Sequence, residues 1–103
     1  MRIIWLPLAR KNVKDIFDYH KINASYNVAR NIRKQIFNST RQLSRNPLSG
    51  QEEFYLSELR QNHKYLVSGN YKIIYRIERE QILIIDVFDT RQHPDKIIDE
   101  NRE

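Results

Sequence analysis

The stretch Arg60–Arg91, R-Q-N-H-K-Y-L-V-S-G-N-Y-K-I-I-Y-R-I-E-R-E-Q-I-L-I-I-D-V-F-D-T-R, decides the fold. Its three apolar runs are separated by short polar breaks, which predicts two hairpins in series. Gly69 and Asn70 tolerate a positive φ, so the first break can form a tight turn. The last run, Ile82–Phe88, is apolar on both faces except at Asp86, as expected of a central strand.

The first hairpin is expected to close through a three-residue loop, Ser68-Gly69-Asn70. That register predicts three cross-strand pairs: Val67 with Tyr71, Tyr65 with Ile73, and His63 with Tyr75. One face of the hairpin is then mostly apolar. The other face carries four basic residues: Arg60, Lys64, Lys72 and Arg76. A two-residue loop would shift the pairing by one residue and mix the faces, which a half-buried sheet resists.

The part of the chain before this stretch predicts one strand and two helices. Residues 2–6 form a short β-like run that Pro7 stops, and Pro7 also suits the first turn of a helix. Apolar residues then recur at three- and four-residue spacing over Leu8–His20 and again over Val28–Leu43. This spacing is typical of amphipathic helices. The break between the two helices is short, so we expect an antiparallel helical hairpin.

The predicted order is therefore β-α-α-β-β-β, in one domain spanning residues 1–103. Because helices and strands are segregated along the chain, the fold class is α+β. We expect the helical hairpin to pack on one face of a small antiparallel sheet that includes the first strand. The other face is expected to be partly open and lined by basic residues. Residues 94–100 are compatible with one or two turns of a short C-terminal helix.

Composition excludes several classes of function. The chain has no cysteine, which rules out disulfides, thiolate zinc sites and cysteine nucleophiles. It has neither a signal-like segment nor an apolar run long enough to span a membrane, so we expect a cytoplasmic protein with no membrane partner. Lys and Arg number 18 against 13 Asp and Glu, a net charge of +5 that favours a polyanionic partner.

No cofactor and no metal are expected. The chain has two glycines, both in predicted turns, so it has no phosphate-binding glycine loop. The three histidines are far apart in sequence and match no metal-ligand spacing. What remains is a set of basic and imidazole side chains that can bind phosphate and stabilise charge on it: Arg60, Lys64, Lys72, Arg76, Arg91, His63 and His93.

These candidates differ in how strongly their positions indicate function. Arg91 ends a central strand, where its side chain can reach over the open face. Lys64, Lys72 and Arg76, taken one at a time, need no functional explanation, because solvent-facing strand positions often hold Lys or Arg. His63 is expected to be a cross-strand neighbour, and His93 is a candidate acid or base only by its proximity. Asp86 needs a partner if it is buried, and Arg60 or Arg76 is the expected one.

Three motifs carry a resemblance to a known family. They are L-x-x-N-P-L-x-G at 43–50, L-R-x5-L-V-x-G-x-Y-K-I-I-Y-R-I at 59–77 and I-x-I-x-D-V-F-D-T-R-Q-H-P at 82–94. Together with the order of elements, they resemble the RelE/ParE superfamily of type II toxins over nearly the whole chain. The resemblance implies a growth-inhibiting toxin neutralised by a cognate antitoxin. The five basic residues named above would suit an acidic antitoxin tail or the cellular target.

The superfamily divides by target, and the resemblance favours one branch. RelE-like members cut messenger RNA on the ribosome through attack of the 2′-hydroxyl on the adjacent phosphate, which needs charge stabilisation and an acid/base pair but no metal. Lys72 and Arg91 match RelE basic positions. Tyr65 and His63 stand where RelE has lysines, and Ile97 stands near its C-terminal tyrosine.

ParE-like members instead bind and poison DNA gyrase and need no catalytic residues of their own. Because the RelE set of catalytic residues is only partly present, the chain is expected to be ParE-like. One alternative is a ribosome-dependent endoribonuclease that uses Lys72 and Arg91 with His63 or His93 as acid or base. The other is a degenerate, non-toxic module that only binds an antitoxin.

Overall fold

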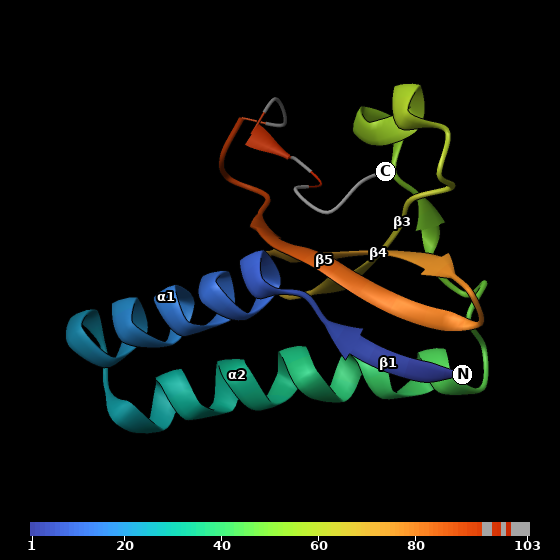
Figure 1. Cartoon of the computed structure of the whole chain (residues 1–103). Helices are drawn as coiled ribbons and strands as arrows, with labels where there is room; N and C mark the ends of the chain where they lie inside the picture. Colours follow the sequence, from blue (N-terminus) through green and yellow to red (C-terminus); the bar gives the residue numbers. More distant parts are fainter. Residues whose placement is uncertain (94–95, 98, 100–103) are drawn as a thin grey trace.

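Two helices pack against one face of a five-stranded sheet in the computed structural model, which describes residues 1–93, 96, 97 and 99 (Figure 1). The elements are β1 Arg2–Trp5, α1 Pro7–Asn23, α2 Tyr26–Thr40, the 3-10 helix η1 Arg41–Ser44, β2 Gln51–Glu52, the 3-10 helix η2 Phe54–Leu59, β3 Lys64–Ser68, β4 Tyr71–Glu78 and β5 Gln81–Asp89. The predicted α+β class and the order of the main elements are confirmed. The short strand β2 and both 3-10 helices are additions to the prediction. The short helix predicted over residues 94–100 lies mostly outside the described residues.

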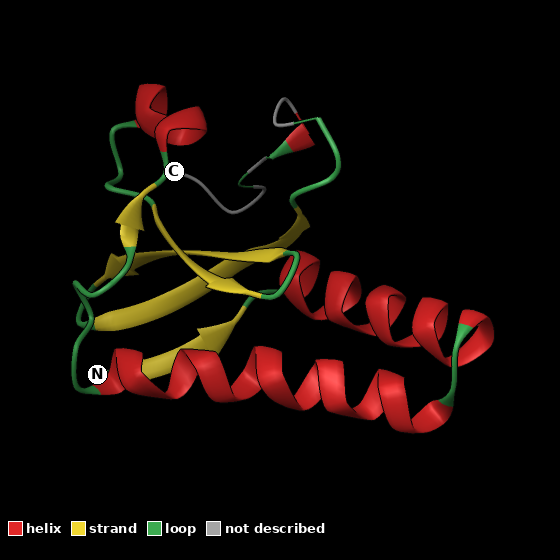
Figure 2. Ribbon diagram, turned by 180° about the vertical axis from the view of Figure 1, so that it is seen from behind, coloured by secondary structure: helices red, strands yellow, loops and turns green. Residues whose placement is uncertain are grey.

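The sheet order is β1-β5-β4-β3-β2, with β1 parallel to β5 and every other pair antiparallel. Strand β5 therefore has a neighbour on both sides, as its continuous apolar run predicted. Ile82, Ile84 and Ile85 within it are fully buried. The parallel pairing of β1 requires a long return connection, which the helical hairpin begins (Figure 2).

The helical hairpin begins and turns where the local sequence directs it. Pro7 occupies the first turn of α1, where its missing N–H costs no hydrogen bond. The hydroxyl oxygen of Ser25 accepts a hydrogen bond from the Val28 amide at 3.1 Å and caps α2. No helix in the described part of the chain is both long and apolar enough to cross a membrane.

The predicted register of the first hairpin is wrong. The turn has two residues, Gly69 and Asn70, and the pairs are Lys64 with Tyr75, Tyr65 with Ile74, Leu66 with Ile73, Val67 with Lys72 and Ser68 with Tyr71. Gly69 has a φ of +58° and Asn70 has a negative φ, a combination that fits a type II′ turn with glycine first.

Burial of Leu66 accounts for the observed register. Leu66 is 9% exposed and faces the helices, whereas Val67 is 59% exposed on the opposite face. The expected register would have placed Val67 and Tyr65 in the core and turned Leu66 outward. It follows that Lys64 lies on the same face as its partner Tyr75, opposite to the face of Lys72. The single basic face predicted from the sequence is thus divided between two faces.

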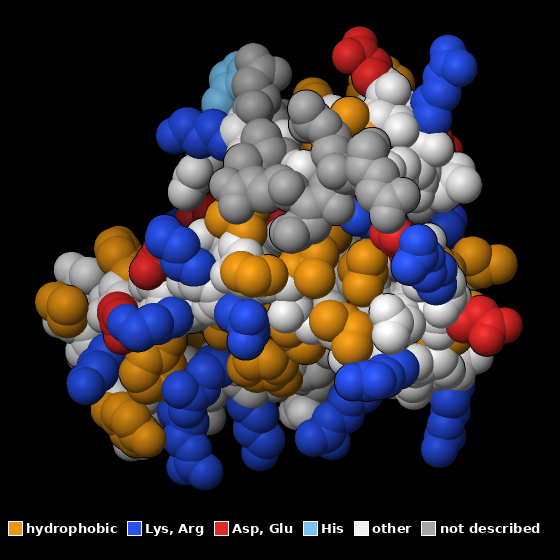
Figure 3. Space-filling view, in the orientation of Figure 1, with side chains coloured by type: hydrophobic (Ala, Val, Ile, Leu, Met, Phe, Trp, Pro, Cys, Tyr) orange, Lys and Arg blue, Asp and Glu red, His pale blue; other side chains and the backbone are white. Residues whose placement is uncertain are grey.

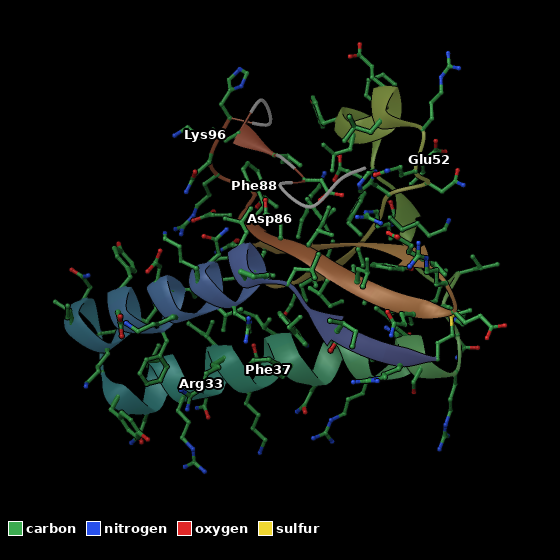
Figure 4. All side chains as sticks on the ribbon, in the orientation of Figure 1. Arg33, Phe37, Glu52, Asp86, Phe88 and Lys96 are labelled. Carbon is green, nitrogen blue, oxygen red and sulfur yellow. The ribbon has the colours of Figure 1, made fainter. Side chains whose placement is uncertain are left out.

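The sheet has an apolar core on each face. The core under the helices contains eleven buried residues: Ala9, Val13, Ile36, Leu43, Leu66, Tyr71, Ile73, Tyr75, Ile82, Ile84 and Val87. The core on the other face is smaller and contains Leu56, Ile74, Ile85, Phe88 and Ile97. In Figure 4, Phe88 lies on the side of β5 away from α2. The second face is therefore partly covered, by η2 and by Ile97.

Tyr75 anchors the loop after η1 to the sheet. Its side chain is fully buried, and its hydroxyl donates to the Pro47 carbonyl at 2.8 Å and accepts from the Gly50 amide at 2.9 Å. A Cβ at Gly50 would lie 2.5 Å from that hydroxyl oxygen, so only glycine fits here. Burial raises the pKa of Tyr75, and the hydroxyl stays protonated and able to donate.

We expect Tyr75→Phe to lower the free energy of unfolding by about 1 to 3 kcal/mol, because it removes the hydrogen-bond partner of two part-buried backbone groups. Tyr65→Phe is the matched control, since the Tyr65 hydroxyl bonds to Gln51 at an exposed site and its loss should have little effect. Urea unfolding followed by circular dichroism measures both. Equal losses in the two variants would contradict the anchoring role of Tyr75.

Candidate functional site

Lys72 lies on the sheet face opposite the helices and is already paired. Its ammonium group lies 3.2 Å from a carboxylate oxygen of Glu53, which is 1% exposed. The same nitrogen lies over the ring of Tyr65 at 4.2 Å and near that of Tyr55 at 5.8 Å. The Lys72 side chain is 21% exposed. The Lys72 charge, which the sequence suggested was free to bind phosphate, is therefore largely enclosed by the two tyrosine rings and balanced by Glu53.

Arg76 is bound by a carboxylate from the C-terminal segment. Its Nε donates to Oδ2 of Asp99 at 2.8 Å, and its terminal nitrogen pairs with Glu78. Arg76 is 3% exposed and Asp99 is 2% exposed. Burial opposes the charge on Arg76, but hydrogen bonds to Glu78 and Asp99 outweigh it and raise its pKa. The guanidinium can reach a partner molecule only if Asp99 moves.

His63 shares the same carboxylate, and its predicted role as cross-strand neighbour of Tyr75 is wrong. Lys64 holds that position, while His63 precedes β3. The Nε2 of His63 lies 2.9 Å from Oδ2 of Asp99, and its Nδ1 is buried with no hydrogen-bond partner among the described residues. The proton therefore resides on Nε2 and points to Asp99. Because His63 is 2% exposed, it cannot reach a substrate on the surface.

Arg91 lies in the turn after β5 and bonds to Asp89. Its Nε donates at 3.0 Å to one carboxylate oxygen, and its terminal nitrogen donates at 2.7 Å to the other. Hydrogen bonding to Arg91 lowers the pKa of Asp89. Arg91 is 60% exposed and borders a cavity of about 500 Å³ between α1 and the end of β5. Of Lys72 and Arg91, the two residues that match RelE basic positions, Arg91 is the more accessible.

The buried carboxylate of Asp86 has a partner that sequence reasoning missed. Its Oδ1 accepts a hydrogen bond from Nδ2 of Asn12 at 2.7 Å, across from β5 to α1. Arg76, the partner expected from the sequence, directs its Nε to Asp99. Asn12 precedes the core residue Val13 in α1. A polar side chain beside the buried face of a helix was the one sequence signal that could have indicated this partner.

The other candidates are dispersed. Arg60 is exposed and ends η2 in the left-handed conformation, with φ of +53°. Lys64 is half-buried on the helix side of the sheet, and His93 is exposed in the loop after β5. Among the described residues no group of three His, Cys, Asp or Glu side chains is arranged to hold a metal ion.

An apolar surface lies beside Lys72. Phe54 is 76% exposed, Tyr55 is 51% exposed and Val67 is 59% exposed. Val67 is the cross-strand partner of Lys72, and the Tyr55 ring lies near the Lys72 ammonium. We call these three residues the η2 patch. An exposed apolar group rimmed by charge is typical of a protein-binding surface.

Comparisons with known proteins agree with this fold. Residues 3–94 match the family model described as ParE toxin of type II toxin-antitoxin system, parDE. A chain of the solved chromosomal ParDE toxin–antitoxin system from P. aeruginosa is similar, with a TM-score of 0.70 and 18% sequence identity, over 84% of this chain and 92% of that chain. At that identity the structural likeness shows the fold alone. A search of curated proteins finds no match.

We expect Asp99→Asn to lower the free energy of unfolding by about 3 kcal/mol, because it removes a buried negative charge that faces a buried guanidinium. Asp18→Asn is the matched control, since Asp18 pairs with Lys14 on the exposed face of α1 and should contribute little. Chemical unfolding measures both variants. If Asp99→Asn is as stable as the wild type, the C-terminal carboxylate does not hold Arg76 and His63.

Proposed function

The chain belongs to the ParE toxin family of type II toxin–antitoxin systems, and on this premise we propose that it inhibits DNA gyrase by binding rather than by catalysis. One observation carries the proposal. The basic residues on the sheet are bound to carboxylates of the same chain, Lys72 to Glu53 and Arg76 to Asp99. A site built in this way favours a structural role for those charges.

Cleavage of RNA would need a different arrangement. A nuclease of this kind places free cations where negative charge develops and puts an acid and a base within reach of the reacting oxygens. Here the carboxylate of Glu53 or Asp99 already balances the charge that a phosphate would use. His63 is buried against Asp99. The pairing therefore supports a binding function over the endoribonuclease alternative, in which Lys72 and Arg91 would act with His63 or His93.

We further propose that a cognate antitoxin covers the η2 patch. Apolar anchors of the partner would pack on Phe54 and Val67, and an acidic tail would approach the neighbouring basic residues. Arg60 and Arg91 are exposed and available to an acidic tail without rearrangement, whereas Lys72 is paired with Glu53 and Lys64 lies on the helix side of the sheet. Arg76 would join them only after Asp99 is displaced.

The gyrase proposal is tested with purified toxin, gyrase, relaxed plasmid and ATP. We expect loss of supercoiled product and accumulation of linear DNA after detergent and protease treatment, because a bound toxin would trap the cleaved intermediate. The control is relaxation of supercoiled plasmid by topoisomerase I, which should be far less sensitive to the toxin than gyrase is. Inhibition of both enzymes at the same toxin concentration would point to masking of the DNA and contradict the proposal.

The alternatives predict other outcomes. Messenger RNA cuts at codon positions in a translating extract, abolished by Lys72→Ala and Arg91→Ala, with gyrase unaffected, would establish the endoribonuclease instead. Absence of both activities, with expression harmless to bacterial growth, would leave a degenerate antitoxin-binding module.

The antitoxin surface is tested by calorimetric titration with the protein encoded by the neighbouring open reading frame. We expect the double variant Phe54→Ser, Val67→Thr to bind at least about tenfold more weakly, because it removes apolar anchors. Ile22→Ser is the control, since Ile22 is 81% exposed at the distant end of the helical hairpin. Undiminished affinity in the double variant would place the antitoxin elsewhere.

A further inference from the structure

The net positive charge of the protein is concentrated in one part of the chain. Residues 19–51 contain six basic residues and no acidic one, leaving 12 basic against all 13 acidic residues elsewhere. The rest of the protein is thus close to neutral. None of these six residues is among the basic candidates identified from the sequence in the stretch Arg60–Arg91.

Five of these basic residues follow α2 and its continuation, and we call them the α2 stripe: Arg30, Arg33, Lys34, Arg41 and Arg45. On α2, Arg33 and Lys34 follow Arg30 by three and four residues, a spacing that keeps side chains on one side of a helix. The side toward the sheet is held by core residues such as Ala29 and Ile36. Figure 3 shows Lys and Arg side chains along the lower border of the molecule, where α2 lies in the same orientation in Figure 1.

The charges of the α2 stripe are not neutralised by the described part of the protein. None of the five forms an ion pair with a described residue, and all but Arg33 are exposed. Arg33 is half-buried, and its guanidinium lies 4.3 Å from the ring centre of Phe17. The α1 lysines differ, because Lys11 and Lys14 each pair with an aspartate four residues later. The uncompensated positive potential is therefore strongest along α2.

The surroundings of the stripe favour a nucleic acid over a protein as the partner. Protein interfaces depend on exposed aromatic or aliphatic anchors. Beside the stripe, the Phe37 ring packs on Trp5 at 4.7 Å and the Tyr26 ring packs on Phe17 at 5.9 Å. These two rings and Val28 are partly exposed, but they do not adjoin as one apolar cluster in sequence, and amide and hydroxyl side chains hold the other exposed positions: Asn27, Asn31, Gln35, Asn38, Gln42 and Ser44. Arginine, lysine, amide and hydroxyl groups are the usual ligands of phosphate oxygens.

The same surroundings favour a duplex over a single strand. Single-stranded nucleic acid is held by aromatic rings on which its bases stack. The Phe37 and Tyr26 rings beside the stripe are partly exposed, but each already packs on another ring, Trp5 or Phe17. A duplex is held through its phosphates and needs no such rings. Fifteen residues of α2 span about 22 Å at 1.5 Å per residue. That length matches the rise of roughly six base pairs along the axis of a DNA duplex at 3.4 Å each.

We propose that the α2 stripe binds the phosphate backbone of duplex DNA without sequence preference. The inference rests on the proposed function for its context, since gyrase acts on duplex DNA, and it adds a DNA contact made by the toxin itself. That contact would hold the toxin beside the DNA segment on which gyrase works.

The test is fluorescence anisotropy of a labelled 30-base-pair duplex titrated with the full-length toxin at 50 to 200 mM NaCl. Five phosphate contacts predict a slope of log K against log salt of about −4.5, or roughly a 500-fold loss of affinity over that range. The variant Arg30→Gln, Lys34→Gln, Arg41→Gln should retain two contacts and lose only about tenfold over the same range. Its affinity at 50 mM NaCl should also be at least about tenfold below that of the wild type.

The matched control removes three charges from other places: Lys11→Gln, Lys14→Gln and Arg79→Gln. It should keep the wild-type slope, as should Arg30→Lys, Arg41→Lys, which preserves the charge of the stripe. Equal weakening in the control and the stripe variant would reduce the effect to net charge and overturn the proposal. Wild-type affinity in the stripe variant, or binding of single-stranded RNA or poly-glutamate in preference to duplex DNA, would also overturn it.

The supercoiling assay separates this inference from the proposed function. Gyrase inhibition by a toxin that does not itself bind DNA would refute the proposed DNA contact and leave the gyrase proposal standing. DNA binding that depends on the α2 stripe, without gyrase inhibition, would refute the gyrase proposal and leave the DNA contact standing.

Discussion

The structure depends on the burial of β5 on both faces. Ile82, Ile84 and Val87 contribute to the core under the helices, while Ile85 and Phe88 contribute to the core on the other face. Strand β5 has one extra residue where Tyr75 pairs with Ile84, and this irregularity lets Val87 rejoin the helix side. A strand without a solvent face needs neighbours on both sides and cover above and below. The parallel strand β1, the helical hairpin and η2 meet those needs.

Charge on this protein divides into two kinds according to its partners. On the sheet, Glu53 and Asp99 lie against Lys72 and Arg76, and these pairs are buried enough that removing one member exposes the other to an apolar environment. On α2 the cations have no such partners among the described residues. The first kind stabilises a particular arrangement of the chain, whereas the second is available to other molecules. The two groups of charges thus differ in how they are paired within the chain.

The sequence predicted the elements well because their signals are local. Helix periodicity, Pro7 and the apolar run of β5 each act within a few residues. The hairpin register was missed because it depends on a competition between Leu66 and its neighbours for one place under the helices. The partners of the site residues were missed because Glu53, Asp99 and Asn12 are distant in sequence from Lys72, Arg76 and Asp86. Only the folded chain brings each pair together.

The parallel pairing of β1 with β5 joins the first and last strands of the fold, with Arg2 opposite Gln81. Strand β1 precedes every other element of the fold in the chain and cannot pair until β5 has left the ribosome. A topology of such high contact order folds slowly and as a late, cooperative event. The sheet of a nascent chain therefore stays incomplete until β5 has been translated. An antitoxin made alongside it would therefore bind each new molecule as soon as the sheet, and with it the antitoxin-binding surface, has formed.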